Sequence, residues 1–296
     1  MWNAVQSTAS SSSDAYLAAA WGSESNCVIV GAYVPSSAGV ILSSTNGGKT
    51  FSRTLISGLI FRDVGAITNS GVLYYLTVAS TGYVYSSINN GSTWSINANL
   101  KAYLLAVSVS SSDAVYIVGK ASKIFRSSAS SQFKSWVDIS CSSYGTYQLN
   151  DVSSFNGVNV IVVGASGLVL TSSDAGTTWA SRTSGTQLDI YEVSCANEFI
   201  ALIAGADGYV ARTSDAGDTW TRIYSVPSAS SFKYHTLSMT NNRVVYLADN
   251  KGFIFRSLDS GQHWYNDSTV ASSAGKSIFA VSMYSTMIGI AGDRYV

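Results

Sequence analysis

The chain has little charge and few of the residues that build metal, disulfide or catalytic sites. Only 11% of its 296 residues are charged, and 17 basic side chains balance 17 acidic ones, so the formal net charge is zero. With no basic excess to neutralise phosphates, the composition argues against a nucleic-acid partner. Gly, Ser and Asn interrupt every apolar run before it reaches the roughly 20 residues of a membrane helix, so we predict no membrane span.

The three cysteines, Cys27, Cys141 and Cys195, fit neither a disulfide framework nor a zinc site. The sequence leaves open whether two of them form a bridge. We predict no bound metal and no cofactor. Residues 1–20 lack the basic start and the long apolar core of a signal peptide. Loops rich in Ser and Thr but poor in charge nevertheless favour an organelle lumen, such as that of thylakoids, or the extracellular space over the cytosol.

One phrase recurs along the chain with a period in the low forties. It reads Ser/Thr-x-Asp/Asn-x-Gly-x-Thr/His followed by an aromatic residue, and we call it the box. Its copies begin at Ser44, Ser87, Ser172, Thr213 and Ser257, and a worn copy lies at Ser128–Trp136. The closing aromatics are Phe51, Trp94, Trp136, Trp179, Trp220 and Trp264, separated by 43, 42, 43, 41 and 44 residues. A sustained period of this length is typical of a β-propeller.

Each repeat contains four short runs rich in Val, Ile, Tyr and Phe, bounded by Gly, Asn and Ser. Leu149–Val152, Val158–Gly164 and Gly167–Leu170 precede one box, and a further run follows its Trp179. Such runs predict four strands and no helix. Four strands per radial repeat form a propeller blade.

We predict seven such blades in a single domain, residues 1–296. The apolar anchor of the innermost strand recurs seven times, at Ala19, Val64, Val107, Val152, Val193, Leu237 and Val281. The C-terminal segment Ile288–Val296 matches the second strand of a repeat and stops where a box should begin. Met1–Ser7 resembles the strand that follows a box. We therefore expect the N-terminal strand to complete the C-terminal blade and close the ring.

The box residues have a structural explanation. Ser, Thr, Asp and Asn side chains bond to turn backbone, Gly supplies a positive φ, and Trp buries a large apolar area. We therefore assign a structural role to Asn46, Asn89, Asp174, Asp215 and Asp259, and to Trp94, Trp179, Trp220 and Trp264.

This phrase is similar to the Asp-box, or BNR repeat, of sialidases, some endoglucanases, sortilin-type receptors and photosystem II assembly factors. The longer units Leu149–Trp179 and Ile190–Trp220 look most like the photosystem II stability and assembly factor propellers. That resemblance implies a non-enzymatic, seven-bladed scaffold that holds partner proteins while a membrane complex is assembled. Because the same fold carries many functions, the resemblance does not identify the partner.

The sequence lacks the residues that a sialidase site would require. Neither of the two prolines, Pro35 and Pro227, belongs to the Arg-Ile-Pro type motif that the resemblance would require. Tyr191 and Glu192 are adjacent, and adjacent residues of a regular strand point to opposite faces, so they would need a bulge to address one substrate. Only three glutamates are present, which leaves few pairs of acids for glycoside hydrolysis. We predict that the chain is not an enzyme.

Three acids precede inner-strand anchors at equivalent positions: Asp63, Asp151 and Glu192. Oxygen ligands gathered at one mouth of the channel would suit a cation, or the Lys or Arg of a partner. The alternative, which we favour, is that each acid bonds to the backbone of a neighbouring strand.

The segments that vary most between repeats are Ala32–Gly39, Val137–Gln148 and Tyr224–Tyr234, all expected on the face opposite the boxes. They carry aromatic residues of the kinds enriched in interfaces, and a row of arginines precedes the boxes. The candidate partner-binding residues are Tyr144, Tyr147, Tyr224, Phe232, Tyr234, Arg126, Arg212 and Arg256. Since the aromatics are not at repeat-equivalent positions, we predict a scaffold that binds protein, such as subunits of a membrane complex. A secreted lectin that binds a glycan is the alternative, and a glycosidase is the weakest one.

Overall fold

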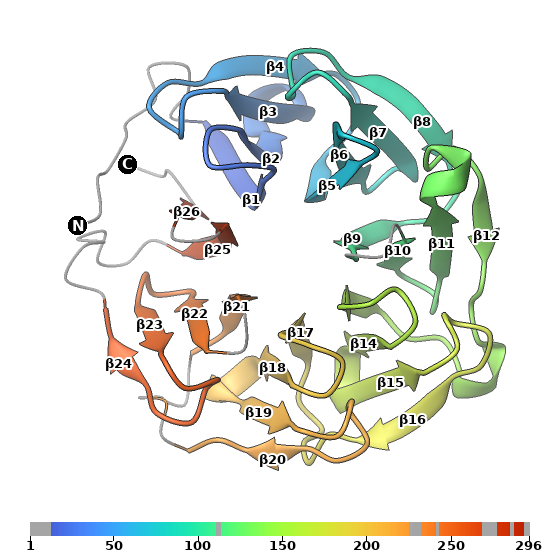
Figure 1. The fold of residues 1–296 in the computed structure, drawn as a ribbon, viewed down its shortest axis with the longest axis vertical. Helices are drawn as coiled ribbons and strands as arrows, with labels where there is room; N and C mark the ends of the chain where they lie inside the picture. The colour runs from blue at the N-terminus through green and yellow to red at the C-terminus, as the bar shows by residue number, and fades with distance from the viewer. Residues whose placement is uncertain are drawn as a thin grey trace.

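The protein is a ring of antiparallel sheets around a central axis (Figure 1). The computed structural model describes residues 13–110, 114–224, 226, 232–240, 243–267, 277–284 and 287–292. Within these residues the regular elements are strands and five single-turn 3-10 helices, with no α-helix. In each four-stranded sheet the strands follow one another in sequence order, from the axis outward, as in a propeller blade.

The strands of the successive blades have the following bounds. Blade 1 contains β1 (Asp14–Trp21), β2 (Cys27–Tyr33), β3 (Ala38–Ser44) and β4 (Ser52–Ile56). Blade 2 contains β5 (Phe61–Asn69), β6 (Val72–Ala79), β7 (Tyr83–Ser87) and β8 (Ser95–Asn99). Blade 3 contains β9 (Leu104–Val109), β10 (Ala114–Gly119), β11 (Ile124–Ser128) and β12 (Trp136–Asp138). Blade 4 contains β13 (Leu149–Ser154), β14 (Val160–Gly164), β15 (Leu168–Ser172) and β16 (Ala180–Thr183).

Blade 5 contains β17 (Ile190–Cys195), β18 (Ala201–Gly205), β19 (Val210–Thr213) and β20 (Thr221–Arg222). Blade 6 contains β21 (Tyr234–Thr240), β22 (Val244–Asp249), β23 (Ile254–Ser257) and β24 (Tyr265–Asn266). A two-stranded hairpin follows, formed by β25 (Ile278–Tyr284) and β26 (Met287–Gly292). The 3-10 helices are η1 (Val34–Ser36), η2 (Ala129–Ser131), η3 (Ser142–Tyr144), η4 (Ala165–Gly167) and η5 (Ala206–Gly208).

The prediction of a propeller built from four-stranded blades is confirmed, but the prediction of seven such blades is wrong. The described residues form six four-stranded blades, and only the hairpin β25–β26 occupies the sector between blades 6 and 1. β25 contacts both β21 and β1, so this hairpin spans the remaining gap around the axis. The physical reason is that the seven anchors mark innermost strands, and the seventh, on β25, is joined among the described residues by one further strand, β26, and by no outer pair. The proposed closing strand, Met1–Ser7, lies outside the described residues.

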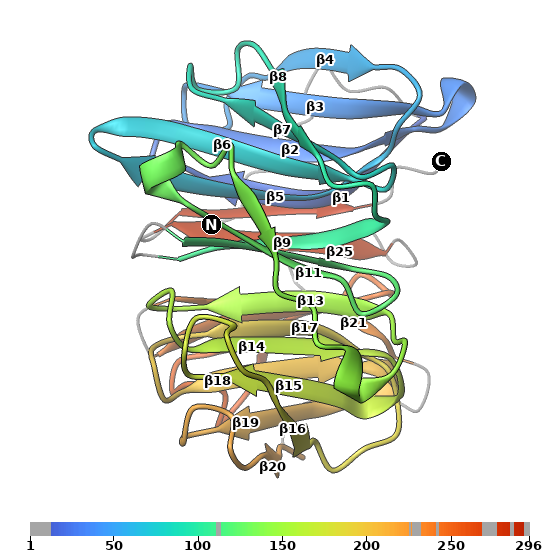
Figure 2. The ribbon, with the colours of Figure 1, turned by 90° about the vertical axis from the view of Figure 1, so that its right-hand side faces the viewer.

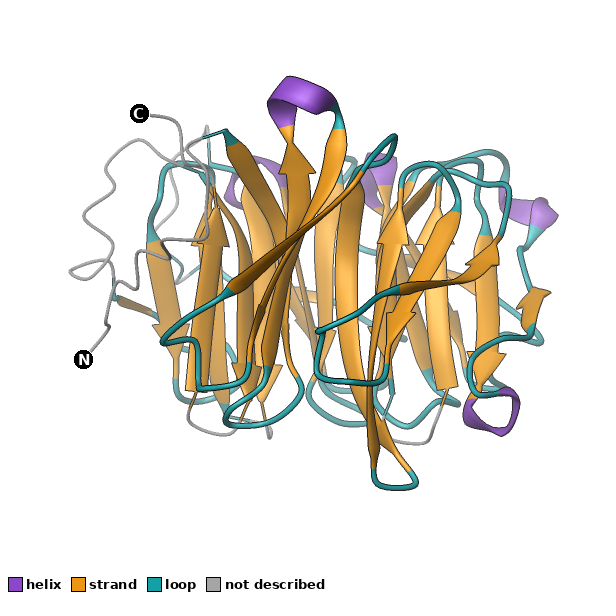
Figure 3. Ribbon diagram, turned by 90° about the horizontal axis from the view of Figure 1, so that it is seen from above, coloured by secondary structure: helices purple, strands orange, loops and turns teal. Residues whose placement is uncertain are grey.

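The strands run between two faces of the ring, which are seen edge-on in Figures 2 and 3. The box turns between third and fourth strands share one face with the turns between first and second strands, and we call it the box face. The connections from second to third strands, and from each fourth strand to the next blade, lie on the other face, which we call the loop face.

Apolar packing between neighbouring blades holds the ring together. Val78 and Val84 of blade 2, for example, share a buried cluster with Leu104 and Ile117 of blade 3. Similar clusters join blade 1 to 2, 3 to 4, 4 to 5 and 5 to 6. Each blade therefore buries its apolar surface mainly against its neighbours, as expected of a repeat protein.

The boxes are closed turns with a shared hydrogen-bond pattern. In the fourth intact copy, Asp215 Oδ1 accepts from the Thr219 amide at 2.9 Å and from the Thr213 hydroxyl at 2.7 Å. The Gly217 amide donates to the Thr213 hydroxyl oxygen at 3.0 Å. Gly217 has a φ of +90°, a backbone conformation that glycine adopts readily because it has no β-carbon. Equivalent bonds form at the other predicted box residues: Asn46, Asn89, Asp174 and Asp259. Their local backbone partners are consistent with a structural role.

We expect Ser257→Ala to destabilise the chain, because Ser257 is completely buried in the box of blade 6. Its hydroxyl donates to Asp259 Oδ1 at 2.8 Å and accepts from the Gly261 amide at 2.8 Å. Alanine would leave a buried amide unsatisfied, at a cost of about 2 kcal/mol, or about 4 °C in Tm. Thermal unfolding measures this effect, with Ser130→Ala at an exposed position as the control. Equal Tm values for the two variants would contradict this role for the box serine.

Candidate binding site at the channel mouth and loop face

A β-bulge interrupts the pairing of every innermost strand near the loop face. In β13, for instance, Leu149 pairs with Gly164 and Asp151 with Val163, so Asn150 is left unpaired. The bulged residues are Leu17, Arg62, Leu105, Asn150, Tyr191, His235 and Phe279. All seven are half-buried. Because bulges re-aim side chains, this row sets what the mouth of the channel presents.

The Val-Gly pattern of the second strands is explained by these bulges. A β-carbon on Gly119 would lie 2.0 Å from the carbonyl oxygen of Tyr103, and one on Gly164 would lie 2.5 Å from that of Gln148. Glycine therefore lets the second strand pass close to the backbone that enters the bulge. The Val-Gly that ends a second strand is thus the sequence signal for the bulged row, and the predictions above did not include that row.

The predicted channel acids connect neighbouring blades. Asp63 accepts from its own Val64 amide at 2.8 Å and from the Val107 amide of blade 3 at 2.7 Å. Asp151 accepts in the same way from Val152 at 2.7 Å and from Val193 of blade 5 at 2.8 Å. These bonds are those of the backbone alternative that we favoured from the sequence.

Glu192 and Thr236 continue this pattern around the ring. Glu192 accepts a backbone hydrogen bond from Leu237 of blade 6. The Thr236 hydroxyl accepts from the Val281 amide of the hairpin at 2.8 Å. A polar side chain before the anchor thus accepts a backbone hydrogen bond from the innermost strand of the next blade or of the hairpin.

The three acids have unusual electrostatics because they line a narrow cavity together. Burial raises the pKa of Asp63 to about 6, and burial together with the charge of Asp63 raises the pKa of Asp151 to about 8. Burial also raises the pKa of Glu192 well above its usual range, with further contributions from the other two acids. Each proton therefore binds more tightly than it would to an isolated, solvated carboxyl group.

The cavity on the axis has a volume of about 130 Å³. The three acids line it together with Leu17, Arg62, Leu105, Asn150 and Phe279 of the bulged row. Within the described part of the chain, no group of three or more His, Cys, Asp and Glu side chains is arranged to hold a metal ion.

An aromatic arc extends from Phe279 along the mouth. The His235 ring lies 5.2 Å from the Phe279 ring and 5.3 Å from the Tyr191 ring, centroid to centroid. Burial lowers the pKa of His235 to about 4, with a smaller contribution from Lys233, so this imidazole is neutral at pH 7. A bulge does place Tyr191 next to Glu192, but Glu192 lines the cavity and Tyr191 does not.

The predicted interface aromatics have different environments. Tyr224 is 79% exposed on the loop face, and the Arg222 guanidinium lies 4.9 Å from its ring centroid. Tyr147 is also exposed, and half-buried Phe232 packs on Phe253 with ring centroids 5.8 Å apart. Tyr144 is half-buried and donates its hydroxyl to the Trp179 carbonyl at 2.9 Å.

Tyr234 is fully buried in the core between blades 5 and 6, so it cannot contact a partner. The reason is its place in the repeat. Tyr234 pairs with the end of the second strand, as do Phe61, Leu149 and Ile190, and all of these fill the core. The sequence pattern contained this information, but the neighbouring variable segment obscured it.

The arginines of the third strands are half-buried and partly engaged within the protein. Arg212 Nε donates to the Ser260 carbonyl of the next blade at 3.2 Å. Arg256 Nε lies 3.3 Å from an Asp267 oxygen in an ion pair. The Nε atoms of both Arg126 and Arg256 are buried without a hydrogen-bond partner among the described residues. The structure therefore does not present the three as one free row.

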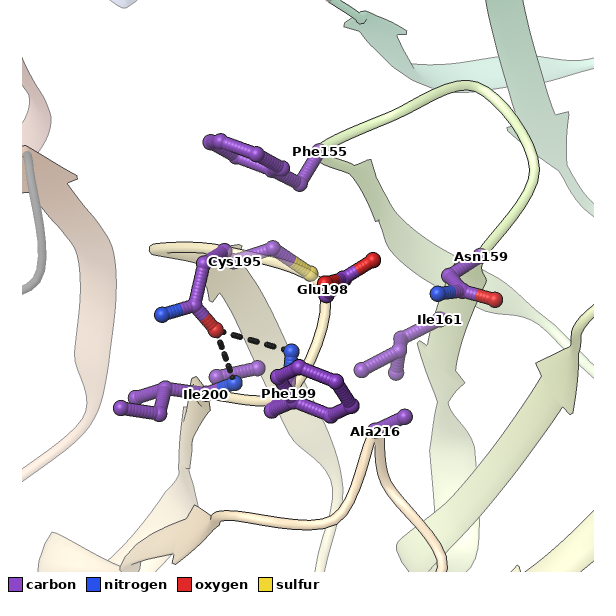
Figure 4. Close-up of a pocket in the computed structure, with 10 residues that line it drawn as sticks. Phe155, Asn159, Ile161, Cys195, Glu198, Phe199, Ile200 and Ala216 are labelled. Atoms are coloured by element: carbon purple, nitrogen blue, oxygen red, sulfur yellow. Dashed lines mark hydrogen bonds between the residues drawn. The ribbon is translucent and has the colours of Figure 1, made fainter.

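A smaller pocket opens on the box face between blades 4 and 5 (Figure 4). Phe155, Cys195, Glu198 and Phe199 line it, and the Asn197 side-chain oxygen accepts from the amides of Phe199 and Ile200. Its volume of about 10 Å³ is only enough for one water molecule. Cys195 is a free cysteine, as are Cys27 and Cys141, and burial raises the pKa of its thiol to about 11.

Residues 95–227 match the family model of the photosystem II assembly factor YCF48. The chain is a BNR-type propeller that resembles this assembly factor. No curated protein matches it in sequence.

Solved structures agree on the fold. A structure of YCF48 bound to a D1 peptide superposes with a TM-score of 0.76 at 15% identity, covering 99% of this chain and 92% of the other. YCF48 from Cyanidioschyzon merolae gives 0.72 at 15% identity, covering 95% and 94%. Raptor from Chaetomium thermophilum gives 0.70 at 12% identity, covering 94% of this chain and 27% of that one. At these identities the likeness establishes a propeller and leaves function to the site. None of the helices in the described residues is long and apolar enough to cross a membrane.

Proposed function

We propose that this chain is a non-catalytic propeller that binds a protein partner through its loop face, as an assembly factor or a structural subunit of a larger complex. The observation that carries the proposal is the set of exposed aromatic side chains on that face. They are Tyr103, Tyr147, Tyr224 and Phe253. Tyrosines and phenylalanines on rigid supports are common anchors of protein interfaces.

The comparisons support the same proposal. A peptide of D1 is bound to a propeller with this fold, so a peptide segment of a partner is a reasonable ligand here. The match to an assembly-factor family favours a partner from a membrane complex, including a photosynthetic one, and a lumenal location. The Lys120 ammonium lies 4.3 Å from the Tyr103 ring centroid and the Arg222 guanidinium lies 4.9 Å from that of Tyr224, so two of the exposed rings on this face carry a cationic neighbour.

Tyr224→Ala should reduce recovery of the partner at least about tenfold, because removing an interface anchor typically costs more than about 1.4 kcal/mol of binding free energy. The measurement is a native pull-down from the membrane and soluble fractions of the source, quantified by mass spectrometry. Tyr265→Ala is the matched control, because Tyr265 is 56% exposed on the outermost strand of blade 6.

A stoichiometric complex that survives Tyr265→Ala and is lost with Tyr224→Ala supports the proposal. Two results would overturn it. One is equal recovery with both variants. The other is retention of the purified monomer on immobilised glycans with release by free sugar, which would identify a lectin.

A further inference from the structure

The axial cavity next to the loop face is large enough for one side chain. Its 130 Å³ are close to the roughly 150 Å³ of a cavity that holds benzene. Carboxyl groups form one part of its wall, and Leu17, Leu105 and Phe279 form apolar parts. A ligand that fits both kinds of wall must combine a positive charge with an apolar or planar surface.

The carboxyl groups have acceptor capacity that their backbone bonds do not use. Each oxygen of Asp63 and of Asp151 accepts one amide hydrogen, whereas a carboxylate offers about four lone-pair sites. Among the described residues none of the three acids forms an ion pair, even though Arg62 lines the same cavity. Without such a pair, these buried carboxyl groups keep protons, as their raised pKa values show, and a cation that enters the cavity would take the place of those protons.

The aromatic arc supplies the planar surface. Phe279 faces the cavity, and His235 and Tyr191 extend the aromatic surface beyond it. A guanidinium group suits these surroundings better than an ammonium, because it is planar, weakly hydrated, stacks on aromatic rings and bonds carboxylates through two parallel N–H groups.

We propose that this cavity binds a single arginine side chain of the protein partner, with the guanidinium between Phe279 and the carboxyl groups. The inference rests on the proposed function only for the source of the arginine. The exposed tyrosines of the loop face would hold the surrounding segment of the partner, while the channel recognises one residue of it.

Protons compete with the guanidinium for this site. The titratable and charged groups around it are Asp63, Asp151, Glu192, Arg62, His235 and Tyr191. Protonation of the acids removes the charge that attracts the ligand, so binding should weaken as the pH falls from 8.5 to 6.

N-acetyl-arginine methylamide tests this site without any partner protein. We expect NMR titration at pH 8.5 to show saturable binding, with shifts at residues around Phe279, and the neutral citrulline analogue to bind at least tenfold more weakly. Glu192→Gln should weaken the arginine probe about tenfold, because it removes one charge-assisted hydrogen bond. Glu198→Gln, exposed on the box face, is the matched control and should bind as the parent does.

Leu105→Arg is a second variant that leaves all three acids in place. Its own guanidinium should fill the cavity and abolish probe binding while the chain stays folded. Equal binding of the arginine and citrulline probes would overturn the inference, as would equal effects of Glu192→Gln and Glu198→Gln. Such a failure would leave the loop-face proposal intact, since the pull-down with Tyr224→Ala tests that separately.

Discussion

Phe133→Ala should cause a larger loss of stability than Ser257→Ala in an intact box. Phe133 lies in the worn box of blade 3 and is completely buried. It packs in the cluster between blades 2 and 3, edge-on to Tyr74 with ring centroids 5.3 Å apart. Truncating a buried Phe costs about 3–5 kcal/mol, which corresponds to at least about 6 °C in Tm for a chain of this size.

The glycine variant separates packing from backbone strain at this position. Phe133 has a φ of +59°, a conformation that costs a residue with a β-carbon about 1 kcal/mol or more. Phe133→Gly should therefore unfold at a higher temperature than Phe133→Ala, although it loses the same ring. Phe155→Ala, at a Phe that is 42% exposed, is the control and should change Tm little. A Tm for Phe133→Ala equal to that of the control would show that the ring does not stabilise the interface between blades.

The worn box also shows how far the sequence could predict the fold. The period and the strand pattern were enough for blades of four strands, because each repeat carries the same apolar and turn residues. They could not show that Phe133 is buried between blades 2 and 3, since the worn copy Ser128–Trp136 lacks the Asp and Gly of the intact boxes. The blade count was wrong because anchors mark innermost strands, and an innermost strand does not require a complete blade.

The candidate site was predicted only in part for a related reason. The register placed Asp63, Asp151 and Glu192 at equivalent positions, and these acids do share one cavity. The bulged row was not predicted because a regular strand points successive side chains to opposite faces of the sheet. A bulge inserts one extra residue into the strand and breaks this alternation. His235 and Phe279 lie in different repeats and share no sequence motif. Their rings meet because each is the bulged residue of its innermost strand.

Raising the pH from 6.5 to 8 should lower the Tm of the parent chain by about 4 °C. The folded state holds protons on Asp151, with a pKa of about 8, and on Glu192, whereas the unfolded chain releases them near its ordinary pKa of about 4. A raised carboxyl pKa makes folding stability fall as pH rises towards the folded value, by about 1.4 kcal/mol per pH unit for each group. Because both side chains keep some exposure to the channel, the expected loss of folding free energy is about 2 kcal/mol in total.

The choice of pH window isolates these two acids. Asp63, with a pKa of about 6, is mostly ionised by pH 6.5. His235 acts in the opposite direction, since its folded pKa of about 4 lowers stability only as pH falls below about 6.5.

Glu192→Gln is the decisive comparison, because glutamine can still accept the Leu237 amide but cannot ionise. Differential scanning calorimetry at the two pH values should show the fall in Tm roughly halved, and the variant should be more stable than the parent at pH 8. Glu198→Gln should leave the parent slope unchanged. If Glu192→Gln instead keeps the full slope, Glu192 does not hold a proton in this pH range, and the fall in Tm has another origin.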